Sequence, residues 1–133
     1  MFLVMGTTGR VGASVAKHLL AEGKQVRAMV RDRLKAADWA ELDVELVDGE
    51  LSDGAAITRA LDGVEGAFIM LPPVYTPSRD FAESKVPIAA YVKALSSAPP
   101  PRLVVLSSNG AEKTSGLGAI TPLSLLERAL AQV

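Results

Sequence analysis

The chain has no cysteine and only one histidine, His18, and each shortage removes a class of function. Without cysteine there can be no disulfide, zinc–thiolate site, iron–sulfur cluster or cysteine nucleophile. Carboxylate pairs such as Glu41 and Asp43 lack the histidine or cysteine partners that metal sites commonly use. We therefore predict no metal centre, and we interpret His18 as a residue on the surface of a helix.

Long apolar runs and an excess of charge of one sign are also missing. No run approaches the roughly 18 residues of a membrane-spanning helix. Met1 leads into residues 2–5 without the basic stretch of a signal peptide. Fourteen Lys and Arg stand against fifteen Asp and Glu, and a formal charge of −1 does not favour nucleic-acid binding. We therefore expect a cytoplasmic protein that binds neither membrane nor nucleic acid directly.

Short apolar runs alternate with longer helical stretches along all 133 residues, a length that fits one domain, residues 1–133. The apolar runs predict strands at residues 2–5, 25–30, 44–47, 67–71 and 103–106. Continuous apolar strands separated by helices are typical of a parallel sheet covered on both faces. We expect a Rossmann-type α/β fold, doubly wound, with strand order 3-2-1-4-5. Its ligand crevice would lie beyond the carboxyl ends of the strands, between strands 1 and 4.

Three helices carry more detailed expectations. Ser52 or Asp53 can cap the third helix. Residues 79–97 are expected to form a helix that Pro87 starts or kinks. Its expected buried stripe is Phe81, Val86, Ala89, Val92 and Leu95. The last helix, residues 123–131, is expected to have Pro122 in its first turn and Thr121 as its cap.

The most informative motif is the glycine loop Gly6-Thr7-Thr8-Gly9-Arg10-Val11-Gly12, between the first strand and the first helix. Gly6 permits a tight turn, Gly9 permits a pyrophosphate to approach the backbone, and Gly12 permits close packing of helix on strand. The helix start offers free N–H groups and a favourable dipole to phosphate. The spacing G-x-x-G-x-x-G differs from the usual G-x-G-x-x-G, and a glycine-rich connection without a ligand is the alternative. No Lys follows Gly12, which excludes a P-loop.

The residues after the second strand bear on which dinucleotide is bound. An NAD site usually has an acid there, whereas this chain has Arg31, and Arg10 lies in the glycine loop. Two guanidinium groups suit the 2′-phosphate of NADP(H). The sequence therefore favours NADP(H) over NAD(H). In the alternative, Arg31 and Arg33 are solvated and Asp32 binds the ribose.

Four segments resemble the atypical short-chain dehydrogenases, and most closely the NmrA-like NAD(P)-binding proteins. They are GTTGRVG, the VRD that ends the second strand, Val47-Asp48-Gly49-Glu50-Leu51-Ser52-Asp53, and LVVLSSNGA. The resemblance runs from Met1 to about Ala111. That family includes NADPH-dependent quinone reductases and redox-sensing regulators. The resemblance implies a cofactor site in which Glu50 and Leu51 lie beside the adenine, Leu71, Pro72 and Pro73 line the nicotinamide ribose, and Ser107 and Ser108 lie beside the nicotinamide.

Together, loop and resemblance give a set of expected cofactor contacts. They are Gly6, Thr8, Gly9, Arg10, Val11, Gly12, Arg31, Glu50, Leu51, Leu71, Pro72, Ser107 and Ser108.

The chain departs from ordinary short-chain dehydrogenases, which use a Tyr-x-x-x-Lys pair after the serine. Both tyrosines, Tyr75 and Tyr91, precede Ser108, and the only later lysine is Lys113. We can name no catalytic residue. We expect an NADPH-dependent oxidoreductase that reduces a quinone-like or small carbonyl acceptor. The alternative is a non-catalytic NADP(H)-binding redox sensor of the NmrA-like type.

The resemblance also bears on chain length and assembly. Relatives continue into a sixth strand and a substrate-capping region, so we expect a domain that is incomplete at its C-terminus. The alternative is a chain that has lost much of its substrate pocket. The expected partner is a small-molecule electron acceptor, and a homodimer is compatible with the sequence.

Overall fold

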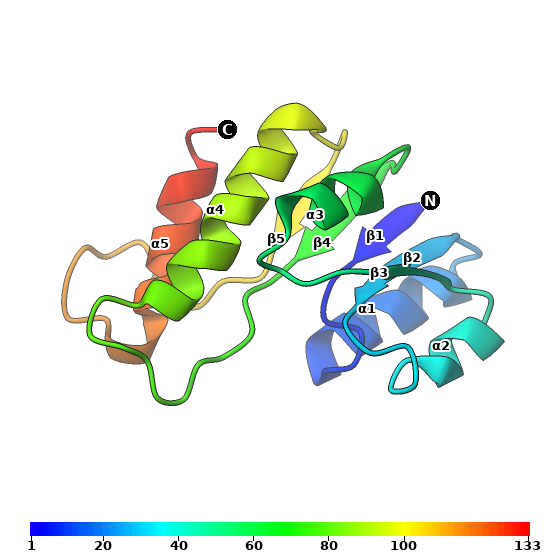
Figure 1. Ribbon diagram of the computed structural model, residues 1–133, viewed down its shortest axis with the longest axis horizontal. Coiled ribbons are helices and arrows are strands. Elements are labelled where there is room, and N and C mark those ends of the chain that lie inside the picture. Colours follow the sequence, from blue (N-terminus) through cyan, green and yellow to red (C-terminus); the bar gives the residue numbers. More distant parts are fainter.

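A computed structural model describes all residues 1–133 and contains one parallel sheet with helices on both faces (Figure 1). The strand order is β3-β2-β1-β4-β5, and every pair of neighbours is parallel. The predicted Rossmann-type topology is therefore confirmed. The strands are β1 (Phe2–Val4), β2 (Val26–Val30), β3 (Glu45–Asp48), β4 (Gly66–Ile69) and β5 (Leu103–Val105).

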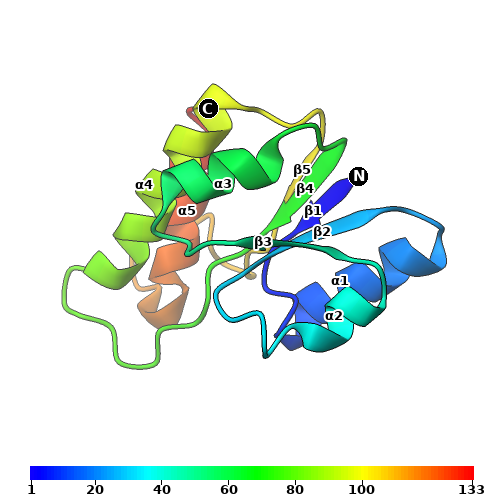
Figure 2. The ribbon, with the colours of Figure 1, turned by 45° about the vertical axis from the view of Figure 1, so that its right-hand side comes forward.

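The helices form two layers, one on each side of the sheet (Figures 1 and 2). One layer holds α1 (Arg10–Ala21) and α2 (Ala37–Glu41). The other holds α3 (Gly54–Leu61), α4 (Ala82–Ser97) and α5 (Thr121–Leu130), with the short 3₁₀ turn η1 (Gly118–Ile120) before α5. No helix combines the length and the apolar character that crossing a bilayer requires.

The central strand β1 shows why both faces must be covered. Successive side chains of a strand point to opposite faces. Leu3 packs into the core beneath α3 and α4, whereas Val4 packs into the core beneath α1 and α2. Both side chains are almost completely buried. The uninterrupted apolar run at the start of the sequence is therefore the signature of a strand between two helical layers.

Two of the expected helix caps can be compared with the structure. Asp53 caps α3, because its Oδ1 accepts hydrogen bonds from the N–H groups of Ala55 and Ala56 at 2.9 and 3.1 Å. The expected cap of α5 is wrong. Thr121 is itself the first residue of that helix, and its hydroxyl donates to the carbonyl of Gly118 in the preceding turn.

The buried face of α4 also differs from the expected stripe. Val86 is 55% exposed, Ala89 is exposed, and Phe81 and Val92 are only half-buried. Of the expected stripe, only Leu95 is buried. The face that packs against α3, α5 and the sheet mixes small and large residues: Ser84, Pro87, Ile88, Ala90, Tyr91, Ala94 and Leu95. Most of these residues recur at helical spacings of three and four, so the expected stripe had the wrong helical phase.

The two edges of the sheet differ in character. At the β3 edge, Arg27 Nε lies 2.8 Å from Glu45 Oε1, and Arg33 Nε lies 2.7 Å from Asp48 Oδ1. At the β5 edge there is no ion pair, and Val104 is 60% exposed. Charged side chains along an edge discourage further strand pairing, so only the β3 edge carries that protection.

The backbone is closely packed where β1 passes into α1. A Cβ added to Gly12 would lie 2.3 Å from the carbonyl oxygen of Gly6 and 2.6 Å from that of Met5. At such distances a side chain fits only if the backbone itself shifts. The expected role of Gly12 in helix–strand packing is confirmed.

We expect Gly12→Ala to lower the free energy of unfolding by about 1–3 kcal/mol, because α1 must move away from β1. Urea unfolding followed by circular dichroism measures this loss. Ser14→Ala, an exposed position of the same helix, serves as the control and should change stability little. Equal stabilities of the two variants would contradict the packing role of Gly12.

Candidate functional site

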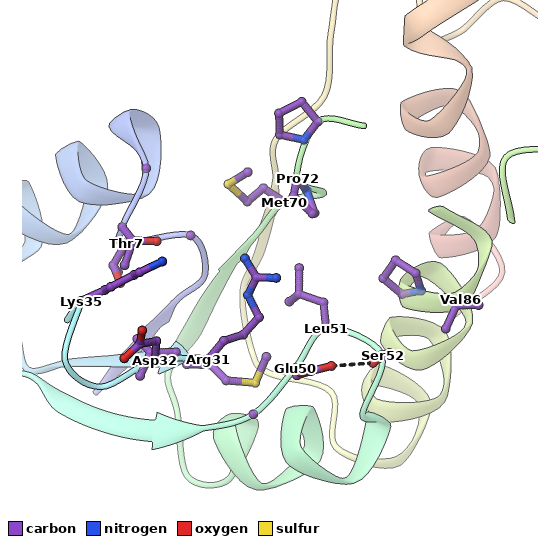
Figure 3. Close-up of a pocket in the computed structure, with 18 of the residues that line it drawn as sticks. Thr7, Arg31, Asp32, Lys35, Glu50, Leu51, Ser52, Met70, Pro72 and Val86 are labelled. Atoms are coloured by element: carbon purple, nitrogen blue, oxygen red, sulfur yellow. Dashed lines mark hydrogen bonds between the residues drawn. The ribbon is translucent and has the colours of Figure 1, made fainter. Parts of the chain in front are cut away.

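A cavity of about 750 Å³ opens at the carboxyl ends of the strands (Figure 3). Four consecutive strand ends contribute to its wall, together with the first turns of α4. A volume of this order is typical of small-molecule and cofactor sites. The lining residues are Gly6, Thr7, Thr8, Gly9, Met29, Val30, Arg31, Asp32, Lys35, Gly49, Glu50, Leu51, Ser52, Met70, Pro72, Pro73, Glu83, Val86 and Pro87.

The glycine loop, whose residues 6–9 line this cavity, contains a row of N–H groups without partners in the chain. Between Thr7 and Gly12, only the N–H of Gly9 donates to an acceptor of the chain, the carbonyl of Gly6 at 2.9 Å. Gly9 is the N-cap of α1 and offers no side chain to cap the helix. The first helical hydrogen bond runs from Ala13 to Gly9. Free N–H groups at a helix start form a ready anion-binding site.

The loop is held close against the rest of the wall. Gly6 has φ +70°, and a Cβ there would lie 2.5 Å from the Sδ atom of Met70. On the other side, the indole Nε1 of Trp39 donates to the carbonyl of Thr7 at 3.1 Å. Trp39 is buried, as expected of a packing residue, but its hydrogen bond to the loop was not foreseen from the sequence.

Several charged side chains lie just after the carboxyl end of β2. Arg31 and Lys35 line the cavity, and neither forms an ion pair. Arg33 is directed elsewhere: it pairs with Asp48 and also donates to the carbonyl of Leu46. Lys35 was missed by sequence reasoning, and the signal that could have found it is a second cation four residues after Arg31.

Acidic groups also reach the cavity wall, but part of their hydrogen-bonding capacity is already used. Asp32 Oδ1 accepts from the N–H of Leu34 at 2.9 Å within the turn after β2. The carboxylate of Glu83 accepts from the N–H and hydroxyl of Ser78. Hydrogen bonds from its own N–H and from Ser78 hold the pKa of Glu83 below its usual range. The wall is therefore of mixed charge, with Arg31 and Lys35 free of partners.

The expected contact residues fall into three groups. The cavity wall includes Gly6, Thr8, Gly9, Arg31, Glu50, Leu51 and Pro72. The first turn of α1 contains Arg10, Val11 and Gly12, which offer N–H groups, while the side chains of Arg10 and Val11 are exposed. The remaining expected contacts, Leu71, Ser107 and Ser108, lie outside this cavity.

A second, smaller cavity of about 230 Å³ adjoins the first and shares Met70, Pro72 and Pro73 with it. Leu71 lies in its wall. The other lining residues are predominantly apolar and come from the β4–α4 connection, the end of β5 and the start of α5: Val74, Pro77, Phe81, Leu106, Ala119, Pro122 and Leu123. This space suits an apolar group next to whatever occupies the larger cavity.

Two hydroxyl groups, those of Ser107 and Tyr91, are engaged elsewhere in the chain. The hydroxyl of Ser107 donates to the carboxylate of Glu127 on α5. Tyr91 is buried, and its hydroxyl donates to the carbonyl of Met70 at 2.9 Å. Burial raises the pKa of Tyr91. Tyr91 therefore supports the wall from behind, while Tyr75 is 89% exposed on the β4–α4 connection.

The model of the NmrA-like family matches residues 1–98. The chain belongs to the NmrA-like family. This NmrA-like chain is 37% identical over 75 residues to the NAD(P)H azoreductase of Xenophilus azovorans, a match that covers 56% of the chain and 26% of the azoreductase. The chain thus spans only part of its longer relatives.

Two solved structures share the fold over nearly the whole chain. One is the triphenylmethane reductase of Citrobacter sp. complexed with NADP(H), with a TM-score of 0.84 and 26% identity over 99% of this chain. The other is an NADPH-dependent quinone oxidoreductase of Escherichia coli complexed with NADPH, with a TM-score of 0.82 and 26% identity over 99%. This chain covers 45% of each. It therefore corresponds in structure to somewhat less than half of these enzymes.

The Tyr91 hydrogen bond yields a prediction about stability. We expect Tyr91→Phe to lower the free energy of unfolding by about 1 kcal/mol, because the Met70 carbonyl loses its partner. Because folding raises the Tyr91 pKa, the unfolded chain releases this proton first. Native stability should therefore fall as pH rises above about 10. The variant should lose less stability there.

Denaturant unfolding between pH 7 and pH 11 measures both effects. Tyr75→Phe is the control, since Tyr75 is exposed, and it should leave stability at pH 7 unchanged. A Tyr91→Phe variant as stable as the wild type at pH 7, with the same decline in alkali, would show that the hydroxyl has no supporting role.

Proposed function

We propose that this chain binds NADP(H) in the larger cavity and forms the cofactor-binding part of an NADPH-dependent reductase. The observation that carries the proposal is the combination of two anion-attracting features in one cavity. Unused N–H groups of the glycine loop suit the pyrophosphate, and the unpaired Arg31 and Lys35 suit a further phosphate. Both features match the phosphates of the cofactor that the two structural relatives bind.

The lining residues fit the other parts of the dinucleotide as well. Glu50 and Leu51 follow β3 and would lie beside the adenine, with Val86 of α4 across the cavity. Pro72 would lie toward the nicotinamide end, where the two cavities join. Leu71 lines the smaller cavity, where it would border the nicotinamide ribose. The cofactor, when bound, supplies the hydride. The residues of this chain hold it and exclude water from one side of it.

The smaller cavity supports a proposal about the acceptor. Its apolar lining favours a flat, poorly hydrated molecule such as a quinone over a charged metabolite. A quinone gains aromaticity on reduction, so it depends less on a built-in acid than a ketone does. The relatives named above are reductases of azo compounds, triphenylmethane compounds and quinones. We therefore propose a conjugated acceptor, reduced by hydride transfer from NADPH.

The role proposed for Arg31 predicts a change in cofactor selectivity. Arg31→Ala should weaken NADPH binding about 10- to 100-fold, because charge-assisted hydrogen bonds to the 2′-phosphate are lost. NADH affinity should change little. Titration of nicotinamide fluorescence measures both dissociation constants.

The matched control for Arg31 is Arg33→Ala. This residue has the same charge two positions away, but it is paired with Asp48 outside the cavity. It should bind NADPH like the wild type. Equal losses of NADPH affinity in the two variants would mean that only general charge matters, and would overturn the assigned site.

Turnover distinguishes a reductase from the alternative of a non-catalytic redox sensor. Neither tyrosine lines either cavity, and the Tyr91 hydroxyl is already bonded to the Met70 carbonyl. This favours that alternative, because no tyrosine proton donor is in place. We expect the full-length protein to oxidise NADPH in the presence of quinones. The steady-state loss of NADPH absorbance at 340 nm measures this turnover. Tight NADPH binding without turnover of any quinone would instead support the sensor.

A further inference from the structure

The hydroxyl of Thr7 is the one buried side-chain polar group of the chain without a hydrogen-bond partner. Thr7 is only 2% exposed, and it lies in the wall of the larger cavity. Buried polar groups in native proteins are nearly always satisfied, and an exception calls for a reason. A valine would fill the same volume without leaving a donor unpaired. An unpaired hydroxyl at a ligand cavity therefore points to a partner that arrives with the ligand.

Thr7 and the two cations follow neighbouring strands of the sheet. Val4, the last residue of β1, lies opposite Ala28 of β2. Thr7 follows β1 and Arg31 follows β2 at the same edge of the sheet, and both line the larger cavity. In Figure 3, Thr7, Lys35 and Asp32 follow the wall formed by the segments after β1 and β2. The unpaired hydroxyl thus shares its side of the cavity with the two unpaired cations.

The backbone of Thr7 is fixed from outside the cavity. Trp39 is buried, and its indole N–H donates to the Thr7 carbonyl at 3.1 Å. The next residue but one, Gly9, closes a turn onto Gly6. With the backbone held, rotation between staggered positions about Cα–Cβ is the motion left to Thr7. A hydrogen bond to a ligand requires a staggered position in which Oγ1 faces the cavity.

We infer that Thr7 is a specificity-determining residue whose hydroxyl donates to an oxygen of the NADP(H) 2′-phosphate, beside Arg31 and Lys35. Trp39 is its positioning residue and acts through the Thr7 carbonyl. A phosphate offers several acceptor oxygens, so it can accept from a hydroxyl and two cations at once. This inference rests on the proposed function, because it names a residue within the same cofactor site.

Three variants of the full-length protein test the inference. Thr7→Val removes the hydroxyl and keeps the shape, Thr7→Ser keeps the hydroxyl, and Trp39→Phe keeps the aromatic packing without the indole N–H. NADPH and NADH are the probes, and nicotinamide fluorescence gives both dissociation constants. Thermal unfolding is recorded in parallel, because a purely structural role would alter it without altering cofactor selectivity.

We expect Thr7→Val to bind NADPH about tenfold more weakly, with NADH affinity within about twofold of the wild type, since one hydrogen bond to a charged group is lost. Its unfolding temperature should equal or exceed that of the wild type. Thr7→Ser should retain most of the NADPH affinity. Trp39→Phe should lose several-fold in NADPH affinity and little in NADH affinity.

Two outcomes would overturn the inference alone. In the first, Thr7→Val binds NADPH as tightly as the wild type. In the second, it loses NADPH and NADH affinity equally, which would place the hydroxyl away from the 2′-phosphate. If the wild type binds neither dinucleotide, the proposed function fails and the inference fails with it. Should Thr7→Val not fold, the Trp39→Phe selectivity ratio decides, and an unchanged ratio counts against the inference.

Discussion

The N-terminus of α1 and the end of β1 approach so closely that no side chain fits between them, and the site depends on that approach. A Cβ on Gly12 would overlap the carbonyl oxygens of Met5 and Gly6. Because the helix begins there without a side-chain cap, its first N–H groups have no partner in the chain. The same constraint that packs α1 on the sheet therefore leaves these groups free for the proposed phosphate contact, and the proposal ties stability and binding to one backbone contact.

The glycine loop is supported from both layers of the fold. On the α2 side, Trp39 holds the Thr7 carbonyl. On the α4 side, Met70 fills the space beside Gly6, and the carbonyl of Met70 in turn accepts from Tyr91. Trp39 and Tyr91 thus do not line the cavity themselves, but each forms a hydrogen bond to the backbone of a residue that does. Support of this kind keeps a binding loop in place without occupying the space that a ligand needs.

Sequence reasoning was most successful where local rules decide the structure. The alternation of apolar runs and helices yields the strand order, and the spacing of Gly6 and Gly12 at a strand–helix junction marks the loop. It was least successful where distant segments meet. The exposed Val86 and the pairing of Arg33 with Asp48 depend on neighbours from other elements. The unpartnered hydroxyl of Thr7 can be recognised only when every surrounding acceptor is placed.

The two edges of the sheet differ in how readily they would accept a further strand. A further strand that approached β3 would meet the ion pairs of Glu45 and Asp48, whose side chains are already committed. A strand that approached β5 would meet open backbone groups beside the apolar Leu103 and Val104. Extension of this sheet, by the same polypeptide or by another, is therefore favoured at β5. The larger cavity lies inward of that edge, among residues at the ends of β1 to β4, so the sheet can widen without rebuilding the site.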